Sequence, residues 1–138
     1  MTRKVATSIL TVLLFLAWGP SEALSQARDF SPQHSNREYA QQRSKTKDVF
    51  VNTPFNLGMV SRFLTDWAGP RSIVRRMNVS MRGNVCAGDD MILSGTVKRK
   101  YVENGEHRVD LDVMISTQDG PVTPCSATLA LPSRNAGP

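Results

Sequence analysis

The sequence predicts an α+β domain in which an antiparallel sheet wraps around one long helix. Residues from about 54 to 67 repeat apolar side chains at the helical period, and strand-like runs alternate with turns from there to residue 131. The chain has 138 residues, of which 40% are hydrophobic and 21% charged. This composition suits a single folded domain with its own core.

The helical elements come first along the chain. Residues 36–42 predict a short helix with Ser35 or Asn36 as its N-cap, and the polar stretch 44–48 predicts a loop. The long helix begins near Pro54, whose missing N–H costs nothing in a first turn, and ends before Gly69. Its apolar stripe, which we interpret as core packing, consists of Phe55, Met59, Phe63 and Trp67, with Val60 and Leu64 beside them.

The strands follow the long helix. We expect them over residues 73–81, 91–102, 108–117 and 122–131, with turns at 84–90, 103–106 and 118–121. Asn104-Gly105 and Asp119-Gly120 are typical of hairpin turns. Because one helix cannot cover the edges of such a sheet, we also expect edge-to-edge association of two domains.

The N-terminal apolar segment, residues 1–24, has two interpretations. Arg3 and Lys4 precede an apolar run over residues 9–18, and small residues follow up to Ala27, which is the layout of a secretory signal. The same run could be a buried first strand, since Ile, Val, Leu and Phe dominate it. It is too short for a membrane span of about 20 residues, so we expect no membrane partner.

Charge and cysteine content narrow the possible ligands. The formal charge of +5 favours an anionic partner, but the basic residues are scattered, so we expect no nucleic acid. Cys86 and Cys125 have no metal-ligand spacing with each other or with the two histidines, His34 and His107, so we expect no metal site. We interpret both cysteines as small buried apolar residues, with a disulfide as the alternative.

The stretch from Arg28 to Ala40 carries the candidate chemistry. Asp29 and His34 are five residues apart with Pro32 between them, so the chain is expected to turn and present both on one side of a loop. A carboxylate and an imidazole that converge on one water molecule form a general acid–base device. The alternative is that Asp29 caps a nearby element and His34 is an exposed loop residue.

The same stretch resembles the hydratase signature of the MaoC-like family. Asp29, Pro32, His34 and Ala40 stand at the signature's spacings, whereas Ser31 occupies a position where Asn is usual. The run 58–70 is similar to the small subunits of actinobacterial steroid side-chain hydratases. The resemblance covers about residues 25–132.

This resemblance implies a fold, an activity and roles for residues. The fold would be a single hot-dog domain over residues 25–132, followed by a disordered tail at 133–138, in a homodimer or a heteromer with a second hot-dog subunit. The activity would be hydration of a 2-enoyl-CoA, or the reverse dehydration, in lipid metabolism or steroid degradation, with coenzyme A as part of the substrate and no other cofactor. Asp29 and His34 would hold the water, the backbone N–H of Thr53 would polarise the thioester carbonyl, and Ser31, Pro32 and Asn52 would support the loop.

The resemblance also bears on the N-terminus and on the competing functions. A hot-dog domain needs a strand before the catalytic loop, and CoA chemistry belongs in the cytosol, so we expect residues 5–18 to form that strand in a cytoplasmic protein. The alternative is a secreted protein with residues 1–27 as its signal. Two other functions remain open: a hot-dog subunit of a heteromeric acyl-CoA or steroid-CoA hydratase that is non-catalytic or depends on its partner, and a small basic secreted protein unrelated to hydratases.

Overall fold

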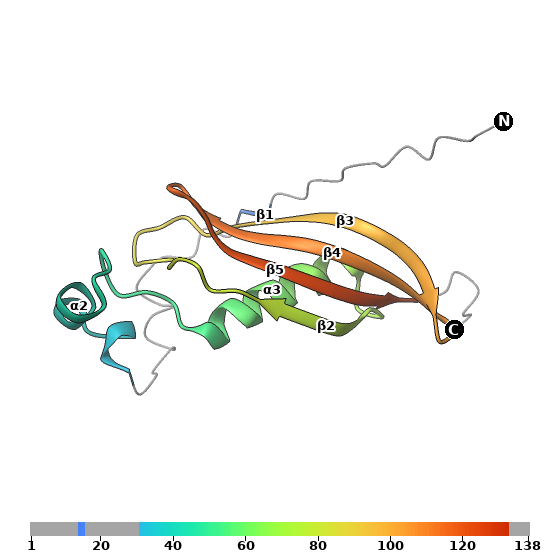
Figure 1. Ribbon diagram of the computed structural model, residues 1–138, viewed down its shortest axis with the longest axis horizontal. Helices are drawn as coiled ribbons and strands as arrows, with labels where there is room; N and C mark the ends of the chain where they lie inside the picture. The colour runs from blue at the N-terminus through green and yellow to red at the C-terminus, as the bar shows by residue number, and fades with distance from the viewer. Residues whose placement is uncertain (1–13, 16–30, 133–138) are drawn as a thin grey trace.

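The computed structural model describes residues 14–15 and 31–132 of the chain (Figure 1). A 3₁₀ turn, η1 (Pro32–His34), leads into the short helix α2 (Arg37–Tyr39) and a π-helical turn, η2 (Ala40–Ser44). The long helix α3 spans Thr53–Ala68. The strands are β1 (Leu14–Phe15), β2 (Ile73–Val79), β3 (Ile92–Glu103), β4 (Glu106–Thr117) and β5 (Gly120–Leu131).

The sheet has the strand order β1-β3-β4-β5-β2, and every neighbouring pair is antiparallel. The predicted α+β class and its four long strands are confirmed. Asn104 and Gly105 both have positive φ, 51° and 77°, as the two-residue turn between β3 and β4 requires.

Of the N-terminal segment, the structure describes only residues 14–15. Leu14 and Phe15 pair with Leu93 and Ile92 of β3. The rest of the strand expected over 5–18, the signal-like end at Ala27, Asp29 and the tail 133–138 lie outside the described residues.

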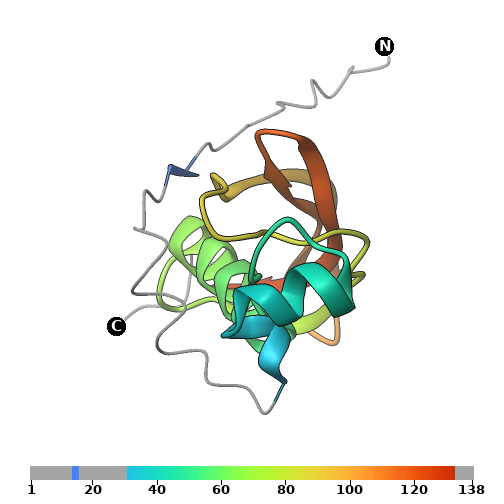
Figure 2. The same cartoon turned by 90° about the vertical axis from the view of Figure 1, so that its left-hand side faces the viewer.

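The sheet curls around α3, as the view along the molecule shows (Figure 2). Register shifts in the pairs β2–β5, β3–β4 and β4–β5 mark irregularities that bend and twist the strands. Helix residues Val60, Phe63 and Leu64 pack on the inner face of the sheet. The strand residues in this core include Leu93, Leu111, Val113, Ile115, Cys125, Ala127 and Leu129. Cys86 and Cys125 are buried free thiols, which agrees with their interpretation as small core residues and not with the disulfide alternative.

The inward face of α3 differs from the predicted stripe at its first turn. Val60, Phe63 and Leu64 are buried as expected, but Asn56 is the residue that continues this face towards the N-terminus of the helix. Phe55 is only partly buried. A polar side chain therefore stands where the apolar stripe begins.

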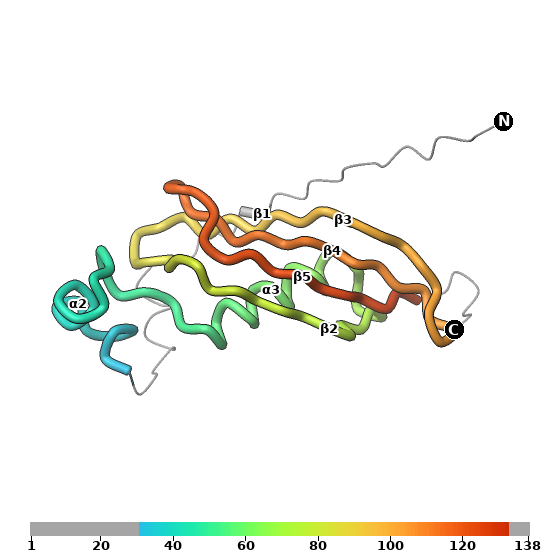
Figure 3. Tube along the Cα trace, in the orientation of Figure 1, coloured from blue at the N-terminus to red at the C-terminus, as the bar shows by residue number. Residues whose placement is uncertain are grey.

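The segment before α3 is fixed by pairing with a loop that follows β2. The Val51 N–H donates to the carbonyl of Val85 over 3.0 Å, and the Ala87 N–H donates to the carbonyl of Val49 over 2.8 Å. Between these bonds Phe50 forms a bridge with Cys86. The η1–α2–η2 unit thus lies beyond the leading end of α3, where the chain enters the helix (Figure 3).

Candidate active site

His34 is a buried histidine with a fixed ring. Only 5% of the residue is exposed, so the alternative of an exposed loop histidine is wrong. Its Nδ1 lies 2.7 Å from the carbonyl oxygen of Phe50, and its ring meets the Phe50 ring edge-on, with centroids 4.7 Å apart. Because a carbonyl only accepts, Nδ1 carries the proton. In the neutral ring Nε2 therefore has the lone pair, which is the form a general base needs.

Gln33 connects this ring to the η2 turn. Its Nε2 lies 3.2 Å from His34 Nε2 and donates to the ring's lone pair, while its Oε1 accepts a 3.1 Å bond from Ser44 Oγ. No pattern in the sequence singles out Gln33. Its place beside His34 was the only available signal, since Ser44 is eleven residues away.

The loop that carries His34 is held by its own backbone. The His34 N–H donates to the carbonyl of Ser31, and both Ser35 and Asn36 donate to the carbonyl of Pro32, the latter over 2.7 Å. Pro32 stands in the first turn of η1, where its fixed φ is suited to the turn. Ser31 acts through its carbonyl, since its side chain makes no cap bond.

The first turn of α3 leaves one amide available. Asn52 is the N-cap: its Oδ1 accepts from the Phe55 N–H over 2.9 Å, and its carbonyl accepts from the Asn56 N–H. Pro54 has no N–H. Thr53 is therefore the residue of this turn whose N–H no described group accepts. This N–H lies at the N-terminus of a 16-residue helix, the positive end of the helix dipole, where a group with partial negative charge is favoured.

A hydrogen bond from the His34 ring ties this residue to the segment that leads into α3. The carbonyl that fixes the ring belongs to Phe50, three residues before Thr53. Asp29 lies outside the described residues, so its distance from His34 remains a prediction. Within 14–15 and 31–132, no three His, Cys, Asp or Glu side chains are grouped so that they could hold a metal ion. None of the helices described there is long and apolar enough to cross a membrane.

Known structures share this arrangement of sheet, helix and connecting turns. A chain of the ChsH1–ChsH2 complex from Mycobacterium tuberculosis superposes with a TM-score of 0.74 at 27% identity, covering 94% of this chain and 100% of that one. The (R)-hydratase from A. caviae involved in PHA biosynthesis gives a TM-score of 0.74 at 21% identity, over 90% of this chain and 96% of that one. A protein described as a MaoC-like dehydratase gives 0.69 at 12% identity, over 91% of this chain and 42% of that one. The chain has the hot-dog fold of these proteins.

The sequence comparison agrees with the structural ones over part of the chain. The 3-oxo-4,17-pregnadiene-20-carboxyl-CoA hydratase beta subunit of Mycobacterium tuberculosis is 36% identical over 70 residues. That match covers 51% of this chain and 54% of the relative, so it spans about half the length of each. No protein-family model matches. The expected family resemblance and the hot-dog fold are both confirmed.

Proposed function

We propose that this protein adds water to the double bond of a 2-enoyl-CoA thioester, or removes it from the 3-hydroxyacyl-CoA. The observation that carries the proposal is the buried His34, whose Nδ1–H is held by the Phe50 carbonyl while Nε2 keeps the lone pair. The likeness to hydratases in fold and in part of the sequence supports it.

In the hydration direction, Asp29 and His34 share the attacking water. As the water oxygen bonds to the β-carbon, the π bond breaks and the pair takes a proton from the water. The electron pair moves through the α-carbon towards the thioester carbonyl, whose developing negative charge the Thr53 N–H accommodates. The same pair then delivers a proton to the α-carbon, so that one molecule of water is added in total and the pair returns to its starting protonation state. A catalytic water takes the place of the Gln33 amide at Nε2.

The remaining features of the proposal follow from this chemistry. The coenzyme A moiety arrives with the substrate, and the steps above need no further cofactor. Such thioesters are found in the cytosol, which we propose as the protein's location. We further propose that the protein associates with a second hot-dog chain, identical or different.

The test is a substrate screen followed by two substitutions. Loss of the enoyl-CoA absorbance measures turnover of short-chain, long-chain and steroid substrates. His34→Ala and Asp29→Asn are each expected to lower kcat by about 10²- to 10⁴-fold, because general acid–base catalysis contributes that much. His107→Ala is the matched control, since His107 is an exposed histidine on β4. Full activity in His34→Ala, or equal losses in His34→Ala and His107→Ala, contradicts the proposal.

A second candidate function is a subunit that is active only with a partner. The likeness to a chain of a two-component complex, over the full length of that chain, favours it specifically. Co-purification followed by mass measurement distinguishes the two. A homomer that hydrates enoyl-CoA alone supports the first function, whereas turnover only after a second hot-dog chain is added supports this one.

A further inference from the structure

Asn56 carries a polar atom that has no partner in the described protein. The residue is 1% exposed, and its Oδ1 makes no hydrogen bond to any described group. Its Nδ2 lies 3.5 Å from the sulfur of Met81, a weak acceptor that gives the amide an orientation. The Oδ1 atom is therefore the acceptor that remains unused.

An unused buried acceptor is unfavourable for folding. Nearly all buried polar side chains find a hydrogen-bond partner, and an apolar side chain of the same shape would remove the desolvation penalty. The next residues on this face of α3, Val60 and Leu64, are apolar and completely buried. The helix thus keeps an amide at the one turn where packing alone favours an aliphatic residue. Such departures from packing rules are expected at functional sites.

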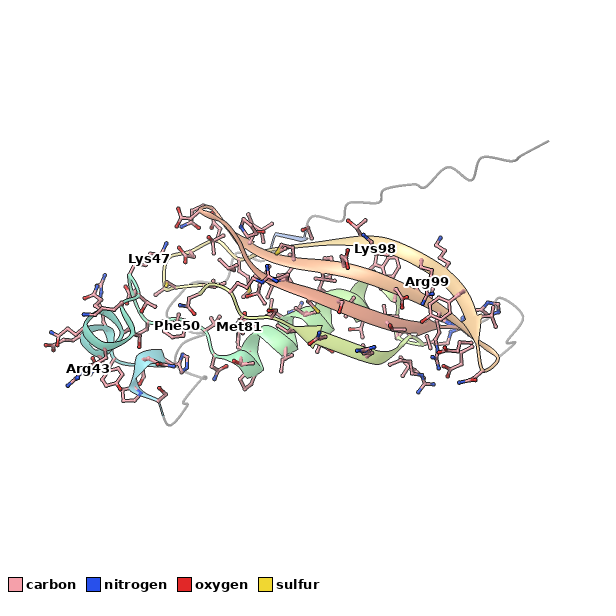
Figure 4. The ribbon with its side chains drawn as sticks, viewed as in Figure 1. Arg43, Lys47, Phe50, Met81, Lys98 and Arg99 are labelled. Atoms are coloured by element: carbon pink, nitrogen blue, oxygen red, sulfur yellow. The ribbon has the colours of Figure 1, made fainter. Side chains whose placement is uncertain are left out.

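The location of Asn56 connects it with the proposed active site. It lies three residues beyond Thr53, on the same turn of α3. Its neighbour Met81 stands at the start of the loop that leads to Cys86. Cys86 forms a β-bridge with Phe50, and the Phe50 carbonyl accepts the hydrogen bond from His34. Phe50 and Met81 are both drawn at the leading end of α3 (Figure 4). Asn56 is the inward-facing polar residue of that end.

The chemistry of Oδ1 restricts what it can bind. It accepts hydrogen bonds and cannot donate one, so a thioester carbonyl does not satisfy it. The group that fits is a hydroxyl or a water molecule. In a hydration reaction these are the water that is added and the 3-hydroxyl group that it becomes. The Thr53 N–H would then bind the thioester carbonyl at C1 of the substrate. The side-chain Oδ1 of Asn56 would bind the hydroxyl group at C3.

We propose that Asn56 is a substrate-binding residue whose Oδ1 accepts a hydrogen bond from the 3-hydroxyl group of a 3-hydroxyacyl thioester, and from the water in the reverse direction. The assignment rests on the proposed hydratase function and adds a residue that recognises the hydroxyl. It makes the protein selective for hydroxyacyl thioesters over the saturated acyl thioesters that lack the hydroxyl.

The test uses the full-length chain in the oligomeric form in which it purifies. Binding of 3-hydroxybutyryl-CoA and of butyryl-CoA is measured by calorimetry, together with kcat/KM and the melting temperature. Asn56→Leu has the same branching without the polar atoms, and Asn56→Ala serves if leucine does not fit. We expect the hydroxyl preference to disappear and kcat/KM to fall about tenfold, the usual effect of one hydrogen bond to the reacting group. The melting temperature should stay constant or rise.

Thr123→Val is the matched control. Thr123 is completely buried, its Oγ1 lies 3.9 Å from the same Met81 sulfur, and valine has its shape. This control should keep the hydroxyl preference. The proposal is overturned if Asn56→Leu lowers the melting temperature and keeps both preference and kcat/KM, or if Thr123→Val has the same effect as Asn56→Leu.

The binding measurement separates this inference from the proposed function. A wild-type chain without turnover that still prefers the hydroxylated ligand, with the preference lost in Asn56→Leu, rejects the hydratase and supports the Asn56 assignment. A wild-type chain with turnover but no hydroxyl preference supports the hydratase and rejects the assignment. Absence of binding to either thioester rejects both.

Discussion

Lys47 and Asp89 link three loops that are far apart in the sequence: the segment before α3, the loop after β2 and the β4–β5 turn. Lys47, in the segment before α3, forms ion pairs with Asp89 and with Asp119 in the β4–β5 turn. Asp89 also accepts from the Cys86 N–H over 2.8 Å and from Gln118 Nε2 over 2.7 Å. Burial acts to raise the pKa of the Asp89 carboxyl, but these hydrogen bonds outweigh it and hold the pKa below its usual value. The cluster fixes the loop whose residues pair with Phe50.

Stability should depend on pH through this carboxylate. A depressed pKa in the folded state stabilises the protein above the unfolded value, about 3.9 for aspartate, and the benefit is lost as the pH falls through the folded pKa. Asp89→Asn should therefore melt at a lower temperature than the wild type at pH 7, and the two melting curves should converge below about pH 4. Asp66→Asn, which alters an exposed pair with Arg62, is the control and should follow the wild type at all pH values. Parallel curves for the wild type and Asp89→Asn contradict the role given to Asp89.

At the scale of elements, α3 and β3 approach each other closely at one position. Gly95 of β3 lies under the buried ring of Phe63, and a Cβ atom at this position would be 2.9 Å from Phe63 Cε1. The sequence places a glycine inside a strand, where it normally weakens the strand, because the helix approaches so closely here.

Two glycine substitutions test this packing. Gly95→Ala should lower the free energy of unfolding by about 1–3 kcal/mol, since the Phe63 ring has to move. Gly58→Ala, on the exposed side of α3 with nothing within 4 Å, should raise it by up to about 1 kcal/mol because alanine favours helix. Urea denaturation measures both, and an unchanged m-value confirms that the comparison is valid. A neutral Gly95→Ala would show that the ring moves without cost.

At the scale of the whole molecule, strand β2 is an exposed edge of the described sheet. In the described part of the chain it pairs with β5 on one side, and its other edge has no strand beside it. Its first residue, Ile73, is 50% exposed. Unpaired edges of this kind invite a second strand, in agreement with the proposed association of two hot-dog chains.

A charge on this edge should separate the chains. Ile73→Glu is expected to shift the molar mass, measured by light scattering at one protein concentration, towards that of the monomer. Val102→Glu is the control, because Val102 is 62% exposed but lies at the far end of β3. An unchanged mass in Ile73→Glu would show that association uses another surface.

The sequence by itself determined the elements and the candidate base. Helix period, hairpin dipeptides and the spacing of Asp29, Pro32 and His34 act over a few residues, so the helix, the four long strands and the interest in His34 could be predicted from short stretches. Only the tertiary structure decided that His34 is buried, that its partner is the carbonyl of Phe50, and that Asn56, not Phe55, opens the inward face of α3. These facts depend on contacts between distant segments and on the rotation of a helix against a curled sheet. Periodicity locates an apolar stripe only to within about one residue at a helix end, and a main-chain partner leaves no trace in the side-chain pattern.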